Sequence, residues 1–154
     1  MRPATLIRIG ILAIIVLGGV GAYVFRDRLS SDAGTLSVGE CYDDPVGAEK
    51  ITDVQHHPCT ESHTAEVVYV SKLPSGDGTF PTTDVVEAYI RANCVPAWNT
   101  YTGKDFDTDQ VLSLGYYQPS TDSWGHGDRT IICYASRVDG APMTSSVKAG
   151  ATPS

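Results

Sequence analysis

Basic residues are scarce in most of this sequence. The chain carries 11 Lys+Arg and 18 Asp+Glu over 154 residues. Four arginines and one aspartate precede residue 29, so 7 basic and 17 acidic residues follow, a net charge of −10. A body this acidic repels phosphate backbones, which argues against nucleic-acid binding.

Motifs of the common catalytic classes are also missing. The sequence has no phosphate-loop, dinucleotide-binding or kinase motif, no nucleophile elbow, and no C-x-x-C pair typical of zinc sites. Hydrophobic residues make up 42% and charged residues 19%, which excludes both a disordered chain and a polytopic membrane protein. A single small domain with a short appendage is what this composition predicts.

An apolar run stands near the start of the chain. Residues 9–25 (IGILAIIVLGGVGAYVF) carry no charge. As a helix, the 20-residue stretch from Leu6 spans roughly 30 Å, the thickness of a bilayer core. We predict a membrane anchor. The alternative is a cleaved signal peptide with residues 20–22 (VGA) as its cleavage site, but the run is long for such a peptide and continues past Ala22.

Four cysteines, Cys41, Cys59, Cys94 and Cys133, all follow the apolar run. An even number there favours disulfides in an oxidising compartment, and hence a cytoplasmic N-terminus with the main domain outside the membrane. Three connectivities are possible. We favour Cys41–Cys59, which closes the loop before the next strand, and Cys94–Cys133, which joins the main helix to the last strand. The spacing argues against zinc, and we expect no metal and no cofactor.

The rest of the chain predicts a small α+β domain. Strands are expected through Cys41 and over residues 65–73, 111–117 and 129–138, where β-branched and aromatic residues gather. Residues 74–81 and 119–127 are expected to be loops.

One helix is expected from Asp84 onward. Asp84 and Glu87 resemble a capping box, and Pro96 is expected to kink or close the helix. The expected segments are a cytoplasmic N-terminus (1–8), a transmembrane helix (9–25), a linker (26–36), an extracytoplasmic domain (37–149) and a tail (150–154).

Three clusters of residues have the residue types of a metal, calcium or hydrolase site. A metal site or envelope hydrolase centred on His56, His57 and His63 is the alternative to a non-catalytic domain. The acidic run at 105, 107 and 109 begins like a calcium loop, but Gln110 and Tyr116 replace the glycine and glutamate that such a loop requires. A hydrolase triad of Ser123, His126 and Asp128 is disfavoured because the three are crowded into six residues.

Several short motifs together resemble one family. They are residues 38–43 (VGECYD), 57–67 (HPCTESHTAEV), Cys94, Tyr116 with Pro119, 124–133 (WGHGDRTIIC) and 146–148 (SVK). In order and spacing they resemble the septum formation domain family of actinobacteria, over about residues 37–149. The resemblance implies a membrane-anchored extracytoplasmic domain in the cell envelope, linked to septum formation and cell division, with no enzymatic activity attached to it.

The family motifs single out six residues beside the cysteines: His63, Glu66, Trp124, Gly127, Asp128 and Arg129. We expect mainly structural roles for them, with a binding surface as the alternative. His63 and Glu66 are expected to hydrogen-bond one another, and Asp128 and Arg129 to form a charge pair. Trp124 is expected to pack near the Cys94–Cys133 bridge. The predicted function is that of a non-catalytic interaction module with protein partners in the division or cell-wall machinery.

Overall fold

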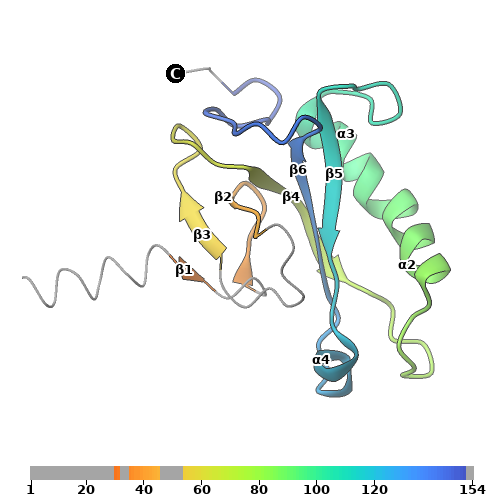
Figure 1. Ribbon diagram of the computed structural model, residues 1–154. Helices are drawn as coiled ribbons and strands as arrows, with labels where there is room; N and C mark the ends of the chain where they lie inside the picture. Colours follow the sequence, from red (N-terminus) through yellow and green to blue (C-terminus); the bar gives the residue numbers. More distant parts are fainter. Residues whose placement is uncertain (1–29, 32–34, 46–53, 152–154) are drawn as a thin grey trace, which may run out of the picture.

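The computed structural model describes residues 30–31, 35–45 and 54–151. Figure 1 shows an antiparallel sheet with helices against one face. The elements in chain order are β1 (Ser30–Ser31), β2 (Cys41–Asp43), β3 (Val54–His57), β4 (Ala65–Lys72), α2 (Thr83–Tyr89), the π-helix η2 (Ile90–Cys94), α3 (Val95–Thr102), β5 (Leu112–Tyr117), α4 (Thr121–Gly125) and β6 (Thr130–Arg137). The small α+β fold with two disulfides is therefore confirmed.

The sheet has the strand order β1-β3-β2-β4-β6-β5, and each neighbouring pair is antiparallel. The four expected strands correspond to β2, β4, β5 and β6. The sequence reasoning missed β3, because its residues VQHH show no apolar alternation. Pairing with β2 and β1 makes it a strand.

Both faces of the sheet are covered by apolar side chains. Along β6, Ile131, Cys133 and Ala135 pack into the core on the helix side, whereas Ile132 and Tyr134 belong to a second cluster on the other face. Burial on both sides explains why β6 reads as a nearly continuous hydrophobic run rather than an alternating one.

The main helix, which consists of α2, η2 and α3 in succession, differs from the expected helix at its start and in its middle. It begins at Thr83 with Thr82 as N-cap, so the prediction of a capping box from Asp84 was wrong. Pro96 does not end the helix. It lies in the first turn of α3, directly after η2, and the helix continues to Thr102. A proline ring clashes with the carbonyl four residues earlier in a regular α-helix, and here the residues before Pro96 form the π-helix η2 instead.

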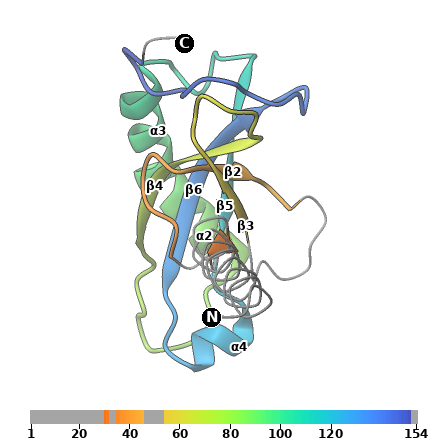
Figure 2. The same ribbon diagram turned by 90° about the vertical axis from the view of Figure 1, so that its left-hand side faces the viewer.

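The two ends of the sheet are closed by short segments. Within the expected loop at 119–127, Ser120 and Ser123 form a capping box that starts α4. The segment after β6 passes over the end of the sheet opposite to α4, the end at which α3 lies, in both Figure 1 and Figure 2. There Met143 forms two backbone hydrogen bonds with His63.

A tyrosine cluster lies on the face of the sheet away from the helices. The hydroxyls of Tyr117 and Tyr134 donate to the two carboxylate oxygens of Asp44 at 2.7 and 3.0 Å. The ring of Tyr42 packs edge-on against that of Tyr134, with 6.0 Å between centroids. Burial raises the pKa of all three tyrosines, so their hydroxyls keep their protons at physiological pH.

Gly115 makes room for this cluster, because a Cβ at that position would overlap the ring of Tyr134. We expect Gly115→Val to lower the free energy of unfolding by about 2–3 kcal/mol, since the ring must leave its place over the strand. Urea denaturation would measure it. Ser113→Thr, on the same face of β5, keeps the hydroxyl that contacts Ser136; it is the control and is expected to cost under ~1 kcal/mol. Equal stability of Gly115→Val and the wild type would contradict the argument.

Candidate functional site

The expected family residues fall into two groups, and the first surrounds Glu66. Glu66 lies in β4 with no exposed surface. Its Oε1 accepts hydrogen bonds from the Tyr101 and Ser146 hydroxyls, both at 2.6 Å, and its Oε2 accepts one from the Val147 backbone N–H at 2.7 Å. Three donors thus satisfy a buried carboxylate that forms no ion pair with any residue the structure describes. The contacts tie β4 to α3 and to the C-terminal segment.

This network has an electrostatic consequence for Tyr101. Burial, followed by the contact with the Glu66 carboxylate, raises the pKa of Tyr101. The hydroxyl therefore keeps its proton and remains a donor across the physiological range.

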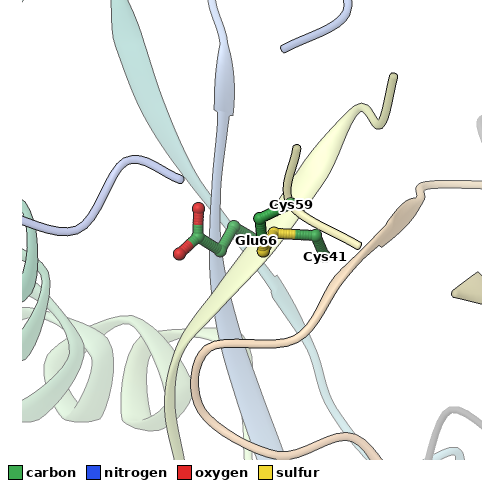
Figure 3. Close-up of side chains that lie close together, drawn as sticks. All are labelled: Cys41, Cys59 and Glu66. Atoms are coloured by element: carbon green, nitrogen blue, oxygen red, sulfur yellow. A yellow bond between two sulfur atoms is a disulfide. The ribbon is translucent and has the colours of Figure 1, made fainter. Parts of the chain in front are cut away.

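The disulfide Cys41–Cys59 adjoins Glu66. The two sulfurs and a Glu66 oxygen lie within 4.8 Å of one another, the one such grouping of metal-ligand atoms within the described ranges. Figure 3 shows the sulfurs bonded to each other and the carboxylate pointing away from them. Cysteine binds a metal through its thiolate, and an oxidised pair offers none. This grouping is a structural junction and does not fit a metal.

The second disulfide, Cys94–Cys133, joins the end of η2 to the middle of β6. Both bridges match the favoured pairing, and the described part of the chain has no free cysteine.

The histidines of the alternative site do not converge. The Nε2 atom of His57 lies 2.9 Å from Asp43. His63, with no exposed surface, places Nδ1 2.8 Å from the Glu61 carbonyl, so that nitrogen donates. His56 precedes His57 on β3, so their side chains face opposite sides of the strand. The predicted His63–Glu66 hydrogen bond was wrong, because each side chain is engaged with other partners.

The second family group surrounds α4. Trp124 is 4% exposed, and its Nε1 donates to the Gly78 carbonyl at 2.8 Å. The Arg129 guanidinium lies 3.7 Å from the Trp124 ring centroid and donates to the carbonyls of Trp124 and Asp128, each at 2.7 Å. Gly127 sits between them at φ +93°, a conformation that favours glycine.

Two expectations concern this group. Trp124 packs in the helix-side core that also contains Cys94 and Cys133. Its ring contacts are with Phe80 and Arg129. The Asp128–Arg129 charge pair was wrong. The Asp128 carboxylate accepts the Thr130 backbone N–H at 2.8 Å, whereas Arg129 binds the Asp128 carbonyl. Both side chains hold the turn between α4 and β6.

The acidic residues at 105, 107 and 109 make local contacts that stabilise their loop. Asp109 pairs with Lys104 at 2.9 Å, and Asp107 with Arg91 at 3.1 Å. Asp105 accepts the backbone N–H of Asp107. The three carboxylates thus have different partners.

The atoms of the disfavoured triad are also engaged locally. The Ser123 hydroxyl caps α4, and the His126 ring contacts the Asp122 carbonyl. They form no triad with Asp128, whose carboxylate binds Thr130.

A hollow of about 500 Å³ lies elsewhere, between the main helix and β5. Its apolar lining comes from Ile90, Val95, Phe106, Leu114 and Tyr116. None of these was predicted as a site residue. The uncharged sequence of β5 was a signal for a binding surface. The hollow could not be predicted from it, because its other wall is a helix that only the tertiary fold brings beside β5.

The fold is that of a small disulfide-bonded α+β domain whose family residues hold the sheet, the helix and the terminal segment together. The family described as "Septum formation" matches residues 33–151. The chain belongs to the septum formation family. Neither a curated protein nor a solved structure matches it.

The expected membrane anchor at residues 9–25 lies outside the described residues. Among those that are described, no helix has the length and hydropathy needed to cross a bilayer.

Proposed function

We propose that the protein is a non-catalytic interaction module, anchored in the cell membrane by one N-terminal helix, which acts outside the membrane in septum formation. Family membership points to a role in cell division. The uncharged run at residues 9–25 supports the anchor, and the two disulfides are typical of an oxidising compartment.

One observation carries the interaction role. Glu66, Trp124 and Arg129, which stand in the family motifs, form contacts within the domain. The hollow beside β5 is lined, apart from Tyr116, by residues outside those motifs. The residues that hold the domain together are thus distinct from most of the residues that line the hollow. Binding surfaces are commonly carried in this manner on a rigid scaffold.

Live-cell imaging tests this function. A fluorescent protein is fused to the N-terminus of the full chain and, as a matched control, to a chain that lacks residues 37–149. We expect the full chain to concentrate at division sites and the truncated chain to spread evenly over the membrane, since the partner is met outside. An even signal from the full chain would contradict the septal role.

A further inference from the structure

The edge strand β5 lacks the features that usually protect a sheet edge from pairing with another chain. Its residues LSLGYY include no charge and no proline. Its register with β6 runs without a bulge from Leu112 to Tyr117. The opposite edge strand, β1, has only two residues. Natural proteins usually block long apolar edges with charges, prolines or bulges, so an unblocked edge suggests a binding partner.

The hydrogen-bonding pattern shows which groups of β5 face the open edge. Val138 donates its N–H to the Val111 carbonyl at 3.0 Å, which makes 111 and 138 a hydrogen-bonded pair. Antiparallel pairs alternate, so Ser113 and Gly115 also bond to β6, whereas the backbone groups of Leu114 and Tyr116 point outward. The Leu112 N–H points outward too, but Asp109 already accepts it at 2.7 Å.

The open edge and the hollow are continuous. Leu114 and Tyr116 line the hollow with their side chains while their backbone groups face the edge. A strand added beside β5 would place every second side chain over the hollow, against Ile90, Val95 and Phe106. Strand addition of this type takes affinity from main-chain hydrogen bonds and specificity from pockets for alternate side chains.

The charges around the hollow favour a basic occupant. Asp84 and Glu87 line it, and neither forms an ion pair with a described residue. Arg91 also lines it, but its guanidinium pairs with Asp107 at 3.1 Å and lies 5.6 Å from the Phe106 ring centroid. The available charge at the hollow is therefore negative.

We propose that β5 accepts an extended segment of a partner protein as an added strand. The segment inserts apolar side chains into the hollow and presents a lysine or arginine to Asp84 and Glu87. This proposal rests on the interaction role proposed above and names its surface and the chemistry of its partner.

A second copy of the chain fits this surface less well. Its own β5 offers no lysine or arginine to the two carboxylates. The segment from residue 29 onward carries a charge of −10, from 7 basic and 17 acidic residues, so two copies repel each other.

The probe is a labelled peptide, KTVTVTK, measured by fluorescence anisotropy against the full chain in a mild detergent. In the extended peptide the lysines and valines lie on one face, whether the peptide runs parallel or antiparallel to β5. Two control peptides are ETVTVTE and a KTVTVTK whose alternate backbone amides are methylated. We expect KTVTVTK to bind, more weakly at high salt. The methylated peptide should bind at least about tenfold more weakly, because it cannot complete the strand.

Variants of the protein test the surface. The double variant Asp84→Asn/Glu87→Gln is expected to bind KTVTVTK roughly fivefold more weakly, because two charge contacts are lost. The matched control, Asp122→Asn/Glu61→Gln, removes the same charge from residues that do not line the hollow and should bind as the wild type does. Tyr116→Pro, which deletes the outward N–H, should bind more weakly than Tyr116→Thr, which keeps it.

The results separate the possible outcomes. Binding of KTVTVTK with slowed hydrogen exchange over residues 112–117 supports the proposal. Absence of binding, equal binding of the methylated peptide, or equal effects of the two double variants would overturn it. Concentration-dependent dimers with slowed exchange in β5 but no peptide binding would identify a second copy as the occupant instead.

Imaging separates this proposal from the septal role. Septal localisation that survives Asp84→Asn/Glu87→Gln and Tyr116→Pro overturns the assigned surface but leaves the septal role intact. Peptide binding at β5 without septal localisation would overturn the septal role alone.

Discussion

Replacing Cys94 and Cys133 together with alanine is expected to bring the domain close to its unfolding limit. The bridge closes a sequence separation of 39 residues, and on the chain-entropy model its loss lowers the free energy of unfolding by about 4 kcal/mol. Both cysteines have no exposed surface and lie in the helix-side core, so their removal also costs packing. A domain of this size has a total stability of only about 5–15 kcal/mol.

The other bridge provides the matched comparison. Cys41–Cys59 closes a separation of 18 residues, worth about 3 kcal/mol on the same model, and lies where β2 meets the segment after β3. Urea denaturation of the two double variants measures the difference. We expect Cys94→Ala/Cys133→Ala to unfold at the lower urea concentration. The reverse order would show that the helix is held to the sheet mainly by other contacts.

The disulfide frame and the order of strands and helix could be predicted because each depends on a local or one-dimensional signal. The apolar runs at β4 and β6 predict central strands, and the even number of cysteines predicts two disulfides. In each case, the residues that give the signal also form the structure.

The errors concern contacts that depend on the assembled fold. Glu66 was paired with His63 because the two are close in sequence, but its partners Tyr101 and Ser146 lie 35 and 80 residues away along the chain. The strand β3 exists because β2 presents an edge to it. The hollow beside β5 needs the helix and the strand together, and no local pattern encodes their distance.

Truncating Glu66 is expected to release the C-terminal segment from the domain. Glu66→Ala leaves the Tyr101 hydroxyl, the Ser146 hydroxyl and the Val147 N–H without their acceptor in a buried site. Hydrogen bonds to charged groups are worth more than neutral ones, and unsatisfied partners add a desolvation cost. We expect a loss of about 3–5 kcal/mol in the free energy of unfolding.

Glu66→Gln separates the role of the charge from that of the acceptors. Its amide oxygen can accept the Val147 N–H while its NH₂ group donates to the two hydroxyls, each of which can also accept a hydrogen bond. The expected loss is therefore only about 1–2 kcal/mol.

Two measurements check these variants, urea denaturation and hydrogen exchange of the amides at 146–148, with exposed Glu61→Ala as the control. Faster exchange in Glu66→Ala, little change in Glu66→Gln and none in Glu61→Ala is the expected order. If Glu66→Gln were as damaging as Glu66→Ala, the negative charge itself would be what holds the terminal segment in place.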